Sequence, residues 1–170
     1  YLVKHKHWSP FEMASACFEI ETTRDIARQL LRHRSFSFQE FSQRYADVRD
    51  LDDSLVIRKA RLQDTKNRQN SIITDDTNLH INWEQHQRNV WSAAMKAYEW
   101  AIENGIAKEQ ARAVLPEGNT STKLYVNGTI RSWIHYVELR SAHGTQKEHI
   151  ELAREIAKAI ALIYPKIEEM

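Results

Sequence analysis

The chain has 170 residues, enough for one domain that buries a real apolar core. Its hydrophobic content of 42% and charged content of 28% are ordinary for a soluble globular protein, and its formal net charge of +1 offers no general basic field for nucleic acid. A single cysteine excludes an internal disulfide framework and is consistent with a reducing compartment. No apolar run approaches a membrane span, and no signal peptide is visible.

The beginning of the chain predicts a strand followed by a helix. Residues 13–21 place apolar and polar side chains in loose alternation, which favours a strand. Thr22 or Thr23 can cap the helix predicted at residues 23–34. We expect that helix to end near Arg34, where cationic side chains oppose the negative end of the helix macrodipole.

Two segments after this helix lack a sustained period. Residues 35–45 carry three phenylalanines at a spacing that fits neither a helix nor a strand for long, and we expect an ordered, partly buried loop there. Residues 46–80 are polar and charge-mixed. They fit either a mobile flap over a site or a variable surface excursion, and we favour the second.

The remainder of the chain is predicted to be helical except for one short strand. That strand is expected at residues 124–126, followed by a turn at Asn127-Gly128 and a helix cap at Thr129. Apolar side chains that repeat at three and four positions predict four helices, at residues 83–104, 107–114, 130–143 and 146–163.

Charged and hydroxyl side chains gather in the run QLLRHRSFSFQEFSQ, from Gln29 to Gln43, with Arg44 and Tyr45 just beyond it. An arginine side chain matches a phosphate with two parallel hydrogen bonds, and serine hydroxyls with loop amides can complete such a site. An isolated Arg-His-Arg triplet is more often the cationic end of a helix followed by a surface loop. The added serines, glutamate and arginine at short fixed distances favour a site for an anionic, hydrogen-bonding ligand.

The helix predicted at residues 130–143 carries a second candidate surface. Arg131 and His135 are four positions apart and share a face, and Arg140 lies toward the end. The alternative interpretation is a partly exposed Arg/His pair beside an ordinary surface arginine. The opposite face is predicted to be core, through Ile130, Trp133, Ile134 and Val137.

Cysteine and histidine are the other residue types in this chain that could carry chemistry. Cys17 lies in an apolar, strand-like stretch away in sequence from the arginines, so we predict a core side chain and not an activated nucleophile. His5 and His7 lack nearby cysteine or further carboxylate ligands, which falls short of a zinc pattern. We expect no metal.

The spacing Arg32-His33-Arg34-x-x-Ser37-x-x-x-x-Ser42-x-Arg44 resembles the RHRxxSxxxxSxR signature of flavin-dependent thymidylate synthases at every specified position. Three further segments are similar to stretches of that family: HKHWSPFE at residues 5–12, ARAVLP at residues 111–116, and TIRSWIH at residues 129–135 with the arginine at position 140. Ser9 stands where threonine is usual, and Thr129 stands where asparagine is common. The resemblance leaves out roughly residues 46–80.

The resemblance implies an α+β fold, a mostly helical single domain over residues 1–170 with a small antiparallel sheet. In the family a strand and a helix precede the position of Tyr1, and we expect them to be missing here. The implied reaction is reductive methylation of dUMP to dTMP in dTTP biosynthesis, with methylenetetrahydrofolate as carbon donor and hydride from NADPH carried by FAD. No cysteine nucleophile is needed. The resemblance also implies a homotetramer with sites between subunits, no nucleic-acid or membrane partner, and a cytoplasmic location, in the host cytoplasm if the gene is viral.

The family's functional residues carry over to this chain position by position. Binding of dUMP falls to Gln29, Arg32, Glu40, Phe41, Ser42, Gln43, Arg44, Arg112 and Arg140, with Phe41 and Gln43 contributing backbone amides to the phosphate. Binding of FAD falls to Ser9, Arg32, His33, Arg34, Glu40, Thr129, Ile130, Arg131 and His135. The catalytic role falls to Arg140, which would stabilise negative charge developing at the N3–C4 edge of the pyrimidine. Ser42 has no adjacent base and is expected to position the ligand.

Two other classes of protein stay open at this point. One is a nucleotide- or RNA-binding module in which Phe36, Phe38 and Phe41 act as stacking platforms, and strong salt-dependent RNA affinity would favour it. The other is a family member that keeps the fold but has lost activity, which retained flavin without turnover would indicate.

Overall fold

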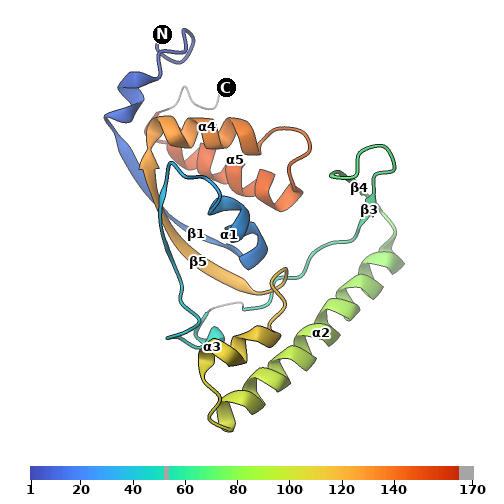
Figure 1. Cartoon of the computed structure of the whole chain (residues 1–170). Helices are drawn as coiled ribbons and strands as arrows, with labels where there is room; N and C mark the ends of the chain where they lie inside the picture. Colours follow the sequence, from blue (N-terminus) through green and yellow to red (C-terminus); the bar gives the residue numbers. More distant parts are fainter. Residues whose placement is uncertain (52–53, 165–170) are drawn as a thin grey trace.

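A three-stranded antiparallel sheet organises the chain (Figure 1). The computed structural model describes residues 1–51 and 54–164. β5 (Ser121–Thr129) lies between β1 (Ser15–Thr23) and β2 (Ser37–Glu40). β1 pairs with β5 along its whole length, whereas β2 pairs only with residues 124–127 in the middle of β5. Because side chains alternate along β5, one face of the sheet is buried and the other faces outward.

Three helices cover the buried face of the sheet (Figure 1). They are α1 (Arg24–Leu30), α4 (Ile130–Arg140) and α5 (Lys147–Ala161). The short 3-10 helix η1 (Ser9–Glu12) leads into β1 and contacts α4. The largest fully buried side chains of this core include Leu30, Leu124, Trp133, Ile134, Tyr136 and Ile160. This core holds α1, α4 and α5 in fixed positions around the Arg-His-Arg run.

A long helix, α2 (Thr77–Glu103), extends away from the sheet (Figure 1). Asp76 caps its first turn by accepting a hydrogen bond from the Leu79 amide at 3.0 Å. Its far end packs through Tyr98 into a smaller core with the short helices η2 (Val48–Asp50), α3 (Lys108–Ala111) and η3 (Arg112–Val114). Near its start lies a hairpin of β3 (Arg61–Gln63) and β4 (Ser71–Ile73).

The α+β class, with most regular structure helical and one small antiparallel sheet, is confirmed. The strand expected at residues 13–21 forms two residues later, and α4 and α5 form close to their predicted ranges, whereas α2 begins at Thr77 and not at residue 83. Thr129 is confirmed as a cap, because its hydroxyl accepts a hydrogen bond from the Ser132 amide. Thr23 is the residue before α1, but its hydroxyl donates to Asp25 and makes no capping bond.

Three predictions about the sheet are wrong. Residues 35–45 are not all loop, because Phe38 pairs with Val126 and draws this stretch into β2. Asn127-Gly128 is not a turn, because pairing with β1 continues to the end of β5. Cys17 is not a core residue: it lies opposite Asn127 on the outward face of β1 and is exposed.

Two boundary predictions also differ from the structure. The first helix ends at Leu30 and not near Arg34, because the chain leaves it through turns closed by the amides of Arg32 and His33. No regular element was predicted within residues 46–80, yet this segment contains the short helix η2, the β3–β4 hairpin and the first turn of α2.

Candidate active site

The Arg-His-Arg run lies in the turn between α1 and β2 and meets the end of α4. Arg140 donates from Nε to Nε2 of His33 at 2.9 Å, joining residues 107 positions apart. Burial, with the positive charges of Arg140 and Arg32, lowers the pKa of His33 to about 4. His33 is therefore neutral near pH 7, and its proton lies on Nδ1 because Nε2 accepts.

Positive charge accumulates here, and the described residues place no paired carboxylate against it. Burial, and the nearby charge of Arg32, lower the pKa of Arg140, but a guanidinium stays protonated at any working pH. Arg32 and Arg34 are exposed. Within residues 1–51 and 54–164, no carboxylate forms an ion pair with Arg32, Arg34 or Arg140. This group of cations is suited to an anionic ligand.

Glu40 ends β2 and is held by two residues that sequence analysis did not single out. Its Oε1 accepts from Arg24 at 3.3 Å and from the Thr122 hydroxyl at 3.0 Å. Thr122 is 82 positions away in the sequence, so only the pairing of β2 with β5 brings it near. The carboxylate is thereby fixed in a partly buried position.

The loop after β2 lies beside α3. Arg44 pairs with Glu109 at 3.3 Å, and the half-buried Arg112 follows directly after α3. The Phe41 amide donates to the Lys123 carbonyl at 2.8 Å and so extends the sheet. This amide, predicted to bind the phosphate of dUMP, is therefore already engaged within the chain. The Gln43 side chain is buried, and in the described part of the chain its Nε2 has no hydrogen-bond partner.

Predicted flavin-binding residues gather where η1 meets the start of α4. Arg131 forms an ion pair with Glu12 at 2.9 Å, and the His135 ring lies edge-on to Trp8 with 5.4 Å between centroids. Ser9 is exposed on η1. Two neighbouring groups are already engaged within the chain, since the Thr129 hydroxyl caps α4 and the Ile130 amide donates to the Ala14 carbonyl.

These groups lie at different ends of β5 (Figure 1). The Phe41 amide bonds near the start of the strand, whereas Thr129 ends it and Gly128 packs against Phe36, three residues after His33. Five residues separate Lys123, which Phe41 meets, from Gly128, which Phe36 meets, a distance of about 17 Å along the strand. The contact of Arg140 with His33 and the loop after β2 therefore lie at separate places along β5.

The three phenylalanines on which the RNA-binding alternative depends are packed into the protein. Phe36 is 8% exposed and packs on Trp133 with 4.3 Å between ring centroids, while Phe38 and Phe41 are half-buried. The phenylalanines therefore do not form an open stacking platform for RNA bases.

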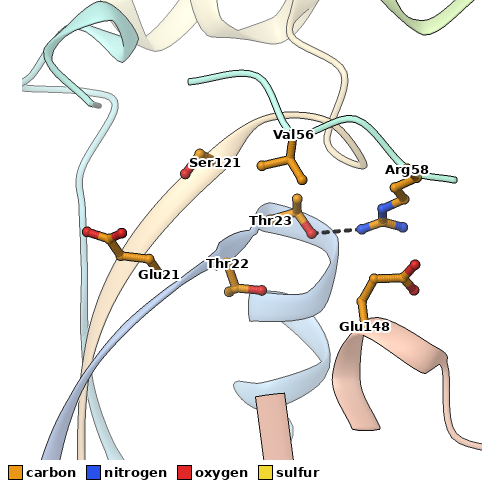
Figure 2. Close-up of a pocket in the computed structure, with 7 residues that line it drawn as sticks. All are labelled: Glu21, Thr22, Thr23, Val56, Arg58, Ser121 and Glu148. Carbon is orange, nitrogen blue, oxygen red and sulfur yellow. Dashed lines mark hydrogen bonds between the residues drawn. The ribbon is translucent and has the colours of Figure 1, made fainter. Parts of the chain in front are cut away.

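Figure 2 shows a pocket that contains none of the predicted site residues. It has a volume of about 310 Å³ and lies beside the end of β1 and the start of α5. Arg58 closes one side by donating to Thr23 Oγ1 and Asp25, both at 2.7 Å. Its lining residues are Glu21, Thr22, Thr23, Val56, Arg58, Ser121 and Glu148.

The described residues form neither a metal-binding cluster nor a membrane-spanning helix. No three side chains of His, Cys, Asp or Glu among them come together in a way that could hold a metal ion. None of the helices they form is both long and apolar enough to cross a bilayer.

Comparison with known proteins decides the family. The family model described as thymidylate synthase complementing protein matches residues 1–166. A probable flavin-dependent thymidylate synthase of Paramecium bursaria Chlorella virus 1 is 48% identical over 167 residues, which cover 98% of this chain and 76% of that relative. The chain belongs to the flavin-dependent thymidylate synthases.

Other members and a solved structure agree with this family. The flavin-dependent thymidylate synthase of Synechocystis is 46% identical over 167 residues, covering 98% of this chain and 75% of the relative. The crystal structure of a UMP/dUMP methylase, PolB from Streptomyces cacaoi bound with 5-Br UMP, superposes with a TM-score of 0.79 at 28% identity. That match covers 95% of this chain and 75% of the methylase. The sheet and helices described above are thus the fold of a flavin-dependent thymidylate synthase family member.

Proposed function

We propose that this protein methylates C5 of dUMP to give dTMP, as a step of dTTP biosynthesis. In this proposal methylenetetrahydrofolate supplies the carbon, and NADPH supplies hydride through FAD. The observation that carries the proposal is the contact between Arg140 and the neutral His33, with Arg32 beside them and no carboxylate paired to them within the described residues. The names of the relatives and of the methylase similar in structure support the same chemistry.

Arg140 is the residue we assign to the chemical step. Its Nε is held by His33, which leaves the two terminal nitrogens to donate to a ligand. Placed against the N3–C4 edge of the uracil ring, these donors would favour the electron-rich, enolate-like form that C5 needs in order to accept a carbon. His33 acts as the orienting acceptor, and it can do so only while it is neutral.

The remaining dUMP contacts are assigned to residues from both ends of the sheet. Gln29, Arg32 and Arg140 lie around the end of α4, whereas Glu40 and the loop of Phe41, Ser42, Gln43 and Arg44, with Arg112, lie near the start of β5. Because these two sets are separated in one chain, we infer that each site is completed by a second copy. A homotetramer with shared sites satisfies this requirement.

FAD, when bound, supplies the hydride that reduces the transferred carbon to a methyl group. The donor set fits an anionic dinucleotide, because Arg32 and Arg34 are exposed and, among the described residues, unpaired with carboxylates. We assign its binding to Ser9, Arg32, His33, Arg34, Glu40, Thr129, Ile130, Arg131 and His135. Of these, Thr129 is the weakest candidate for a side-chain contact, since its hydroxyl already caps α4.

No thiol takes part in the proposed reaction. Cys17 is exposed on the outward face of the sheet, whereas Arg140 ends α4 on the helical face. A thiolate attack on the pyrimidine would require the cysteine beside the activating cations. A reducing, cytoplasmic location completes the proposal.

The test compares Arg140→Ala with Arg28→Ala, an exposed arginine of α1 that pairs with Glu117. Loss of a preorganised donor typically lowers the rate about 100- to 1,000-fold, so Arg140→Ala should bind flavin but form almost no dTMP. Arg28→Ala should behave as wild type. Near-normal dTMP formation by Arg140→Ala would remove Arg140 from the mechanism.

A further inference from the structure

A buried histidine outside the family motif contacts one of the residues assigned to dUMP. His149, in the first turn of α5, is fully buried. Its Nδ1 lies 3.2 Å from Gln29 Oε1, and its Nε2 lies 3.0 Å from the Tyr136 hydroxyl. These two contacts use both ring nitrogens, so His149 links α1 to α4 through α5.

A chain of hydrogen bonds runs from Glu148 through Gln146 and Gln29 to His149, and the ion pair of Glu148 with Arg61 sets the direction of each bond. Arg61 of β3 contacts Glu148 at 2.7 and 3.0 Å. Burial alone would raise the pKa of Glu148, but hydrogen bonds from Arg61 and Gln146 outweigh it and lower that pKa to about 2. An ionised carboxylate only accepts, so Gln146 must turn its Nε2 toward Glu148, at 3.0 Å, and its Oε1 the other way.

The orientation of the Gln146 amide then fixes the next two groups. Gln29 must donate from Nε2 to Gln146 Oε1, which it does at 2.8 Å, and this turns Gln29 Oε1 toward His149. His149 must therefore carry its proton on Nδ1, and its bare Nε2 accepts from Tyr136. Burial raises the pKa of Tyr136, so its hydroxyl remains a donor, and burial with the charge of Arg140 lowers the pKa of His149 to about 4.

We propose that His149 is a positioning residue for substrate binding: as the Nδ1–H tautomer it donates to Gln29 Oε1 and, together with Gln146 at Gln29 Nε2, holds the Gln29 amide in the orientation in which it meets dUMP. The inference rests on the proposed role of Gln29. A glutamine amide can be turned by 180° with little change of shape, so its orientation must be set by its neighbours. With one Nε2 hydrogen and one Oε1 lone pair engaged, Gln29 keeps one donor and one acceptor site in a defined arrangement.

The two ring nitrogens of His149 can be separated by substitution. His149→Asn keeps a donor at the position of Nδ1 and loses the partner of Tyr136. His149→Gln keeps an acceptor near the position of Nε2 and loses the donor to Gln29. His86→Gln on the exposed surface of α2 is the matched control.

We expect His149→Gln to raise KM and Kd for dUMP roughly 3- to 10-fold, the cost of one hydrogen bond, with kcat within about twofold. His149→Asn should keep the wild-type KM while its thermal stability falls. Gln29→Ala should also raise KM, and adding His149→Gln to it should change KM by less than about twofold, because the group that His149 positions is gone.

Several outcomes would overturn the inference. One is a wild-type KM in His149→Gln, and another is an equal rise of KM in both His149 variants. A full additional rise of KM in the Gln29→Ala background would assign His149 a purely structural role. Nitrogen NMR of His149 gives a readout that does not depend on turnover, since the inference requires the Nδ1–H tautomer and an Nε2–H tautomer contradicts it. Failure of the wild-type protein to form dTMP would refute the proposed function, while the tautomer would still decide whether the hydrogen bonds run as inferred.

Discussion

Gly128 allows Phe36 to pack against β5, and adding one methyl group there should have a large effect. A Cβ at position 128 would lie 2.2 Å from Phe36 Cδ1 and 2.6 Å from Cε1. Carbon atoms in contact lie about 3.5–4.0 Å apart, so the ring would have to move by more than ~1 Å. Phe36 is 8% exposed and its ring centroid is 4.3 Å from that of Trp133, which leaves it little room.

Overpacking of this kind costs about 1–3 kcal/mol of the free energy of unfolding. We expect Gly128→Ala to be destabilised by this amount in urea unfolding, with a melting temperature lower by roughly 2–12 °C for a domain of this size. Because Phe36 follows the Arg-His-Arg run closely, its displacement should also lower flavin content. Gly118→Ala is the matched control, since a Cβ there has no atom within 4 Å.

A second substitution separates the clash from other effects of the methyl group. Phe36→Leu removes the ring, so the cost of Gly128→Ala should shrink when both changes are combined. The reasoning is refuted if Gly128→Ala unfolds with the wild-type free energy, or if the cost of the methyl group is the same with leucine at position 36.

Three further predictions follow from charge and exposure. Arg34→Ala should weaken FAD binding roughly 10-fold or more in a titration of the apoprotein, and unchanged affinity would count against our cofactor assignment. Cys17→Ser should give wild-type dTMP formation, whereas loss of activity in a folded variant would reopen a route through a thiol. His33 and His149 have pKa values lowered from 6.5 to about 4, so as the pH falls through this range the unfolded chain binds two protons that the folded chain does not. The free energy of unfolding should therefore fall by up to about 1.4 kcal/mol per pH unit for each histidine. His149→Gln should remove the contribution of one histidine to this pH dependence. A pH dependence unchanged by that substitution would contradict the lowered pKa of His149.

The local pattern predicted the helices well where packing is repetitive. α4 and α5 follow apolar repeats that the core uses directly. The start of α2 was missed by six residues, at Thr77 and not at position 83, because its first turns have no buried apolar stripe and begin at the Asp76 cap. Local composition carries little information about a helix that extends away from the core.

Sheet pairing was the hardest part to predict. The Asn-Gly pair that ends in Gly128 is typical of a turn. In the structure, Gly128 instead lets the ring of Phe36, 92 positions earlier in the chain, pack closely against β5. Cys17 has the chemistry of a core residue, but strand alternation places it outward. Both errors arise because the decisive partner lies on a strand that is remote in sequence.

The motif supplied the candidate residues, and the fold shows which partners they contact. Arg140 and His33 were both predicted, but their mutual hydrogen bond spans 107 positions and has no local signal. Arg24 was missed for the same reason, since it meets Glu40 through the sheet. His149 did have a signal, because it continues the apolar stripe of Ala153, Ile156 and Ile160 on α5, and a histidine on such a stripe is expected to be buried.

The most direct measurement is the visible absorption spectrum of the purified protein, recorded before and after addition of FAD and then with NADPH and dUMP. The account predicts the spectrum of a bound flavin, its bleaching on reduction, and dTMP once methylenetetrahydrofolate is added. A colourless protein that takes up no FAD under these conditions would contradict the account.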